Sequence, residues 1–378
     1  MKIIDRYLLK QFLRTFAIWF VTLMGLYVIF DFFSNMEEFV NFGKKSGGLL
    51  PLVVKFYSYR SVEFFNKYSP LLTLVSAMFT VAWIQRSNEL TALMAAGISK
   101  LRVVTPIICA AIGITVLAAA CREMVIPKFR DQLTINPQQF DTSDGREMQV
   151  TWDNRTDILL RGEKVFREEN RISNPNFLLP KQLSHYGKYL QAADAIYEDA
   201  DRTIGRPRGY RLVGVLRPEN LNEKPSLQLD GEPIVITPMD AQWLKPDECF
   251  VASDISFDQL TTGQLLRQYS STATLIKGLR NPSLDYGTDV RSMIHNRFVQ
   301  PLLDITLLFL GLPLVLRRSN RNVFAAMGLA GVLVIAFFLI QLGCQQFGTF
   351  YAMPAFGAWL PLMIFVPIAV GMFESMRT

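Results

Sequence analysis

The sequence is poor in the residues that build catalytic and metal sites. It has only two histidines, His185 and His295, and its four cysteines show no CxxC spacing. A disulfide framework, a zinc site and a Ser/His/Asp or Cys/His catalytic set are therefore not expected. The GxxxxGKS/T pattern of a phosphate-binding loop is also absent, since "GKKSGG" from Gly43 does not match it. We expect neither an enzyme nor a metal or cofactor of the chain's own.

Charged residues are scarce and unevenly spread. They make up 19% of the chain, against about 25% in soluble domains, while hydrophobic residues make up 50%. No charged residue occurs between Arg321 and Glu374, and a soluble surface cannot be built from such a run. A membrane-spanning helix needs about 20 apolar residues, so this run is long enough for two spans and a turn.

The net charge of +6 is a feature shared with nucleic-acid-binding proteins. The basic residues do not form one face with interleaved aromatic residues, however. Several stand at the ends of apolar runs, where the positive-inside bias of membrane proteins places them. Nucleic acid is therefore not expected as a partner.

Apolar runs predict six membrane spans in two groups of three. The first group lies within residues 1–121 and the second within residues 291–378. The spans cover residues 12–33, a run that ends at 84, and residues 103–121, 298–316, 323–345 and 355–373. An even number of spans places both ends of the chain on the same side of the membrane.

The bases of the short loops predict the orientation. On the side of the N-terminus they are Lys2, Arg6, Lys10, Arg14, Arg86, Lys100, Arg102, Arg317, Arg318 and Arg321. The short loop between the last two spans has none. Both termini are thus predicted to be cytoplasmic, with the middle of the chain outside. Residues 34–67, an expected outer loop, depart from this rule because they carry five bases.

Residues 122–290 are polar and carry short strand-like pieces such as "MQVTWD", "DILLRG" and "YRLVGVLRP". Asp230-Gly231 lies between two short apolar stretches, which is a strong signal for a two-residue hairpin turn. "GRPRG" at 205–209 is a second turn signal, and "TTGQLLRQYSST" is typical of a short helix. We predict an antiparallel β domain inserted between the two groups of spans.

The stretch "QRSNELTALMAAGIS" at 85–99 separates the second and third spans. It predicts a helix near residues 87–97, with Glu89 at its positive end and Gly97 as its stop. One side of this helix would carry Leu90, Leu93, Met94 and Ile98. It is either a linker whose apolar side touches lipid or a docking helix for a cytoplasmic partner. A chain without an ATPase motif of its own favours docking.

Two further features have both a structural and a functional interpretation. Lys44 and Lys45, among aromatic residues after the first span, are either solvated interfacial lysines or cations for the phosphates of an anionic outer-leaflet lipid. Asp304, a carboxylate well inside the fourth span, is either functional or held by a Ser or Thr of a neighbouring helix. We favour the structural interpretation of Asp304.

Three stretches, together with the order of spans and β domain, resemble the LptF/LptG permeases of the lipopolysaccharide exporter. They are "IDRYLLKQFLRTF" at 4–16, "QRSNELTALMAAGIS" at 85–99 and "HNRFVQPLLDITLLFLGLPL" at 295–314. The first is slightly more similar to LptG. The β domain matches by position and length more than by sequence.

The resemblance implies a fold and a set of partners. The fold is a six-span inner-membrane protein (3+3 helices) with an inserted, periplasmic, jellyroll-like β domain. The partners are a paralogous permease, a cytoplasmic ABC ATPase dimer that binds ATP, lipopolysaccharide and a periplasmic β-jellyroll bridge. The family's coupling glutamate falls on Glu89. Its bases after the first span match Lys44 and Lys45 less closely, because Glu37 and Glu38 stand nearer the span.

Other classes of function stay open at this point. The chain could be an ABC-type permease or mechanotransmitter for another lipid or a lipoprotein, or a structural membrane protein without an ATPase. A membrane enzyme is the least favoured, because no catalytic set converges.

Overall fold

The chain divides into two compact units in the computed structural model. The structure describes residues 3–45, 48–137, 145–201, 203, 205–284, 286–317, 323–351 and 353–374. One unit is helical and comprises Met1–Leu133 with Gly287–Thr378, and the other, Thr134–Tyr286, holds the β-strands. The sequence predicts domain boundaries after residues 121 and 290. Residue 121 lies shortly before the first part of the helical unit ends, and residue 290 lies shortly after its second part begins.

Among the described residues, six helices are long and apolar enough to cross a membrane. These candidate spans are Ile3–Ser34, Leu49–Arg86, Lys100–Leu133, Thr288–Leu316, Gly331–Gly348 and Pro354–Glu374. They belong to helices α1 (Ile3–Ser34), α3 (Leu49–Arg86), α5 (Lys100–Ala120) with its extension, α9 (Thr288–Arg317), α10 (Val323–Phe350) and α11 (Pro354–Glu374). The prediction of six spans in two groups of three is confirmed.

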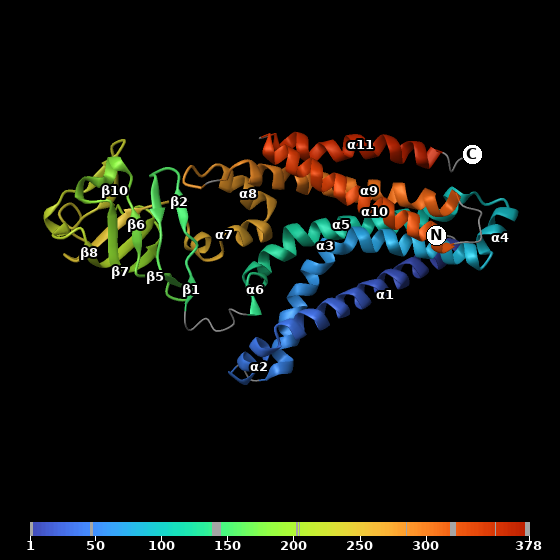
Figure 1. The fold of residues 1–378 in the computed structure, drawn as a ribbon, viewed down its shortest axis with the longest axis horizontal. Helices are drawn as coiled ribbons and strands as arrows, with labels where there is room; N and C mark the ends of the chain where they lie inside the picture. The colour runs from blue at the N-terminus through green and yellow to red at the C-terminus, as the bar shows by residue number, and fades with distance from the viewer. Residues whose placement is uncertain are drawn as a thin grey trace. The chain divides into compact units, whose positions relative to one another are not determined.

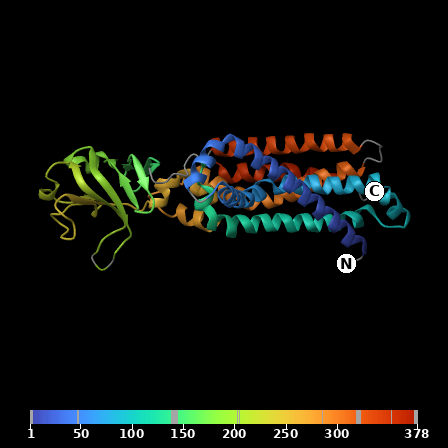
Figure 2. The same ribbon diagram turned by 90° about the horizontal axis from the view of Figure 1, so that it is seen from below.

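The long helices of this unit lie side by side in Figures 1 and 2. The start of α1, the short helix α4 (Glu89–Ala95) and the end of α11 lie at one end of the bundle. Helices α2 (Met36–Lys45) and α6 (Arg130–Leu133) lie at the other end. The start of α1 and the end of α11 therefore share one end of the bundle, as an even number of spans requires. The predicted cytoplasmic bases at 2 and 318–321 lie outside the described residues.

Residues 34–67 do not form the expected outer loop but α2 and the first half of α3. Helix α3 is 38 residues long and contains Pro70. In its first half Phe56 and Tyr57 are buried while Lys55 is exposed, so the bases lie on a helix that hides its aromatic rings. Phe39 of α2 is fully buried against those two rings. The bases of this segment therefore belong to helices and not to a loop.

The core of the helical unit forms where α9 meets its neighbours. Buried leucines of α9 share one apolar cluster with α1, α3, α5, α10 and α11. A Cβ atom on Gly311 of α9 would collide with Leu74 of α3, so the missing side chain lets these helices approach closely. Gly348 of α10 faces Gly357 of α11 in the same way. Small residues at helix contacts are the usual means of packing in membranes.

The β unit is an antiparallel sheet of short strands. Its strand order is β1-β4-β5-β7-β8-β11-β10-β9, and β2, β3 and β6 form a branch that joins at β7. The strands are β1 (Arg146–Glu147), β2 (Thr151–Asp153), β3 (Ile158–Leu160), β4 (Lys164–Phe166), β5 (Arg171–Ser173), β6 (Asn176–Leu178), β7 (Tyr189–Glu198), β8 (Gly209–Arg217), β9 (Leu227–Leu229), β10 (Glu232–Ile236) and β11 (Glu248–Ala252). The predicted antiparallel β domain between the spans is confirmed.

Local turn chemistry places the strands as the sequence predicts. Asp230 and Gly231 both have positive φ angles, of 53° and 83°, as a two-residue hairpin turn of this kind requires, and they join β9 to β10. Gly205, with a φ of 68°, lies in the connection between β7 and β8. The expected short helix is α7 (Phe257–Tyr269), which α8 (Thr272–Leu279) follows.

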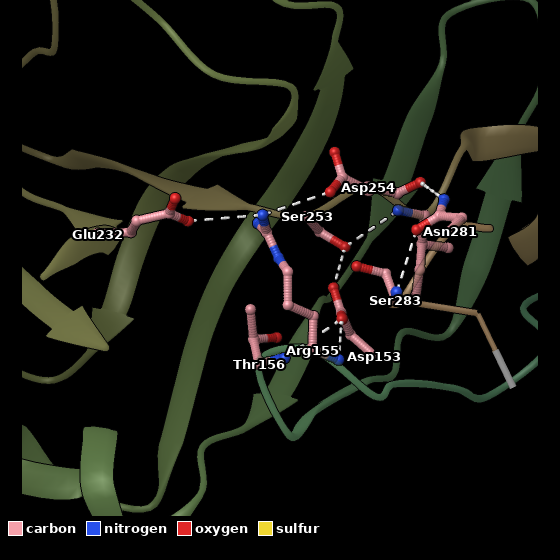
Figure 3. Close-up of polar contacts among 9 residues, drawn as sticks. Asp153, Arg155, Thr156, Glu232, Ser253, Asp254, Asn281 and Ser283 are labelled. Atoms are coloured by element: carbon pink, nitrogen blue, oxygen red, sulfur yellow. Dashed lines mark hydrogen bonds and ion pairs between the residues drawn. The ribbon is translucent and has the colours of Figure 1, made fainter. Parts of the chain in front are cut away.

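A buried carboxylate organises one end of the β unit (Figure 3). Asp153 is fully buried, and its Oδ1 accepts the backbone N–H groups of Arg155 and Thr156 at 3.0 and 3.3 Å. Its Oδ2 accepts the hydroxyl of Ser253 at 2.5 Å. Hydrogen bonds from these three donors offset the free-energy cost of burying the carboxylate.

The segment that leaves the β unit is tied to the same region. Asn281 donates through Nδ2 to the carbonyl of Asp254 at 3.2 Å. The Oδ1 of Asn281 accepts the N–H of Ser283 at 3.0 Å. The carbonyl of Ser283 accepts the N–H of Asn154 at 3.1 Å. The return segment is thereby fixed to the β unit before the chain re-enters the helical unit.

Replacing Asp153 by alanine should loosen this end of the β unit. The N–H groups of Arg155 and Thr156 would lose their acceptor, and an unsatisfied buried group such as that of Thr156 costs about 1–3 kcal/mol. Hydrogen exchange of the intact protein in detergent should become faster at residues 151–156 and 253–255, with the helical unit unchanged. Asp157→Asn is the control, because the exposed Asp157 only accepts the ring N–H of Trp152 at 3.4 Å. Wild-type exchange in Asp153→Ala would contradict the assignment.

Candidate functional site

Helix α4 runs from Glu89 to Ala95, within the range 87–97 that the sequence predicts and with Glu89 in its first turn, and it joins α3 to α5. The hydroxyl of Tyr7 in α1 donates to Glu89 Oε1 at 3.3 Å, which is long for a bond between two oxygens. The carboxylate lies in the first turn, where the helix end is partially positive. Glu89 is therefore favourably placed but only lightly held from within the chain.

Helix α4 ends in a glycine turn. Gly97 has a φ of 78°, and its N–H donates to the carbonyl of Met94 at 3.0 Å. The N–H of Ile98 reaches back to the carbonyl of Leu93 at 3.1 Å. These two bonds form a Schellman motif, in which glycine takes the left-handed position that other residues avoid. Ser99 then caps α5 by accepting the N–H of Arg102 at 3.4 Å.

The two faces of α4 have different surroundings. Leu90 is buried in the apolar cluster of the helical unit, and Leu93 and Ile98 pack against that cluster. Met94 was expected on the same side but is 44% exposed. The helix ends one residue later, so Ile98 reaches the core through the glycine turn while Met94 stays at the edge. The exposed face consists of Thr91, Ala92, Met94, Ala95 and Ala96.

An ion pair that sequence reasoning missed supports the base of this region. Both carboxylate oxygens of Asp5 in α1 accept from Arg102 Nη2 in α5, at 3.1 and 2.9 Å. The Asp5 side chain is 12% exposed, so solvent screens the pair less than it would a surface pair. A lone acid among the bases of the N-terminal stretch was a signal that could have suggested it.

Lys44 and Lys45 end α2, at the opposite end of the bundle from α4. Lys44 is exposed, and Glu37 and Glu38 lie in the first turn of the same helix. The helix therefore has acids at its positive end and bases at its negative end, which suits its dipole. The aromatic packing of Phe39 holds the helix against α3.

Asp304 is held by an amide, not by the expected Ser or Thr. Gln300, one turn earlier in α9, donates through Nε2 to Asp304 Oδ1 at 2.7 Å. Gln341 of α10 donates in turn to Gln300 Oε1 at 3.0 Å. Two glutamines and one carboxylate thus form a hydrogen-bonded chain that links α9 to α10.

The three hydrogen-bonded side chains of Gln300, Asp304 and Gln341 line a polar cavity of about 360 Å³ among α3, α5, α9 and α10. Lys67, Arg122 and Asp304 are its charged residues. Polar cavities inside a membrane bundle are where charged side chains are tolerated. The cavity therefore explains how a carboxylate is accommodated in an otherwise apolar span.

Arg122 makes an unusual contact at the edge of this cavity. Its Nη2 donates to the backbone carbonyl of Arg297 in α9 at 2.7 Å. That carbonyl lacks its helical donor, because residue 301, four positions later, is proline and has no N–H. The π-helical turn Cys121–Val125 carries Arg122, and such turns are frequent at functional sites. Glu123 lies 3.6 Å from Arg122 and 3.8 Å from Arg297.

The structure does not gather the predicted site residues into one place. Glu89, Leu90, Leu93, Met94 and Gly97 share α4 and its turn, but Lys44 and Lys45 end α2 at the other end of the bundle and Asp304 lies within α9. The contacts of Tyr7, Arg102, Arg122, Gln300 and Gln341 were missed. Pro301, four residues after Arg297, was the one sequence signal for the Arg122 contact.

Six apolar helices in two groups of three, with an antiparallel sheet between them, define a multi-pass membrane protein. The family model described as "Lipopolysaccharide export system permease LptF/LptG" matches residues 6–375, and the chain belongs to this family. The family is one of permease components of a transporter. Its model covers both LptF and LptG and does not favour either. No curated protein matches the chain.

The Arg122 contact predicts a specific coupling with Pro301. Arg122→Leu leaves a carbonyl in the bundle without a donor, which should cost about 1–3 kcal/mol of stability. In a Pro301→Ala background that carbonyl regains its helical N–H, so the same substitution should cost clearly less. The free energy of unfolding in detergent measures all four corners of this double-mutant cycle. Lys128→Leu, at an exposed site nearby, is the control, and equal costs in both backgrounds would refute the coupling.

Proposed function

We propose that this chain is a permease subunit of an ABC transporter that extracts lipopolysaccharide from the inner membrane and passes it to a periplasmic bridge. A separate cytoplasmic ATPase dimer would bind ATP and supply the energy, and a paralogous permease would form the second half. Family membership supports the cargo. The observation that carries the ATPase partnership is the two-faced packing of α4.

Helix α4 is built to pass a displacement into the membrane bundle. Leu90 is only 7% exposed and lies in one cluster with Val81 of α3 and Val104 of α5. Packed interiors are stiff and transmit strain rather than absorb it. A partner that moves α4 would therefore move α3 and α5 with it, and the Asp5–Arg102 pair would extend the motion to α1.

The exposed face of α4 suits a protein cleft. Its small side chains, Ala92, Ala95 and Ala96, allow close approach, and Met94 can adapt its shape to a neighbour. Lipid contact alone does not call for a charge at the helix start. Glu89 beside this face offers a carboxylate that can accept two bonds from an arginine of the partner.

Substituting Glu89 separates the two roles of this carboxylate. Glu89→Ala should weaken association with the ATPase or uncouple ATP hydrolysis from lipid release, because breaking one side of a desolvated charge pair costs roughly 2–5 kcal/mol. If Glu89 served only its own helix, the loss would be about 0.3–1 kcal/mol. Co-purification of the ATPase and lipid release from proteoliposomes are the measurements.

Tyr7→Phe is the matched control for Glu89. It removes the internal 3.3 Å contact and leaves the carboxylate in place. We expect it to behave as the wild type, and Glu89→Asp to retain part of the function. Normal ATPase association and normal transport in Glu89→Ala would leave the linker interpretation standing.

The remaining parts fit the same proposal. With α4 and both termini cytoplasmic, α2 would lie at the outer leaflet and the β unit in the periplasm, where a jellyroll-like fold would receive the lipid's acyl chains. Lys44 and Lys45 would then be cations for lipid phosphates. Asp304 would join helices α9 and α10 rather than contact the cargo, since its carboxylate is engaged by Gln300.

Charge reversal tests the two lysines. Lys44→Glu with Lys45→Glu should lower the amount of lipid that co-purifies, with the complex still assembled, as native mass spectrometry can show. The effect should weaken at high salt, because exposed charges are screened within about 8 Å at physiological ionic strength. Lys55→Glu, on the exposed side of α3, is the control. Unchanged lipid occupancy at matched salt would remove the lysines from the site.

A further inference from the structure

Strand register places an apolar row across four strands of the β unit. Trp152 of β2 pairs with Leu159 of β3, and Leu159 pairs with Leu178 of β6. Leu178 pairs with Tyr189 of β7. Residues directly opposite one another in a sheet point to the same face, so these four side chains form one continuous row.

This row lies on the outer face of the sheet, away from the core. The neighbouring positions Leu160, Phe177 and Leu190 are at most 1% exposed and belong to the core of the β unit. Side chains alternate along a strand, so the row points the other way. Trp152 is 44% and Tyr189 is 50% exposed.

Both faces of the sheet are therefore apolar at this place. A sheet with one solvated face shows apolar and polar residues in alternation, whereas strands covered on both faces read as unbroken apolar runs. The runs "ILL" in β3 and "FLL" beginning in β6 are of the second kind. The outer row therefore has the composition of a sheet face that is covered by another surface.

The next row on the same face is basic and polar. The N–H of Asn176 donates to the carbonyl of Arg161, and Asn176 pairs with Gln191, which pairs with Arg217. Both arginines are exposed, and so is Lys188 beside Tyr189. Two acids lie near this face and keep their charge: Asp157 accepts from Trp152, and Glu163 accepts from Asn174 at 2.7 Å. The patch is thus aromatic and apolar along one row, with exposed arginines along the next.

We propose that this outer face of β2, β3, β6 and β7 docks on the anionic phospholipid surface of the membrane that the chain itself spans. Trp and Tyr prefer the boundary between hydrocarbon and water, and arginines there attract anionic headgroups. The β unit is attached to membrane helices at both of its ends, so a bilayer is always near it at high effective concentration. The proposal concerns the surrounding phospholipid and is independent of the transported cargo.

A photo-crosslinking residue at position 189 tests the docking. The full chain is reconstituted in nanodiscs of phosphatidylcholine, with or without phosphatidylglycerol, and the lipid bound to the probe is measured. The matched control places the probe at Met239, which is 61% exposed in the turn after β10 and lies outside the patch. We expect more lipid on the probe at 189 than at 239, rising with phosphatidylglycerol and falling with salt.

Arginine variants test the charge complementarity. Arg161→Gln and Arg217→Gln should each reduce the gain from phosphatidylglycerol at position 189 by about fivefold, with the yield at 239 unchanged. Unaltered hydrogen exchange in β7 and β8 confirms that the variants are folded. Equal lipid labelling at 189 and 239, or labelling of protein instead of lipid at 189, overturns the proposal. The same yield of lipid at position 189 with and without phosphatidylglycerol also overturns the proposal, since the arginines would then have no role.

Discussion

The helical unit is governed by one constraint: a backbone polar group inside a membrane must find its partner within the protein. Pro301 breaks this rule in α9, because it leaves the carbonyl of Arg297 without a helical donor. The guanidinium of Arg122 restores it at 2.7 Å. The π-helical turn at 121–125, the buried arginine of α9 and the polar cavity beside it are arranged around that one bond.

The end of the bundle where α4 lies also depends on a small number of contacts. A seven-residue helix is too short to be stable alone, so its form depends on packing and on its end turns. Leu90 anchors one side, the glycine turn at Gly97 closes the helix, and Asp5 and Arg102 join the helices beneath. What remains exposed is a face of small residues beside one acid.

The sequence predicted what depends on local pattern. Charge-free runs gave the six spans, Asp230-Gly231 gave a hairpin, and Glu89 and Gly97 marked the start and stop of α4. It failed where contacts between distant segments matter: residues 34–67 are helical, with aromatic rings of α2 and α3 packed together, and Met94 is exposed. The partner of Asp304, Gln300, lies one turn earlier on the same helix, and only the further bond from Gln341 depends on how α9 and α10 pack, which periodicity does not contain.

The chain of hydrogen bonds from Asp304 through Gln300 to Gln341 has a direction. Gln300 gives its N–H to the carboxylate, so its oxygen faces Gln341 and receives that residue's N–H. The side-chain oxygen of Gln341 is buried without a hydrogen-bond partner among the described residues. If Asp304 took up a proton it would become the donor, and both amides could turn over so that every bond ran the other way. Helices α9 and α10 would stay joined through the reversal, so their contact tolerates either charge state of the buried acid.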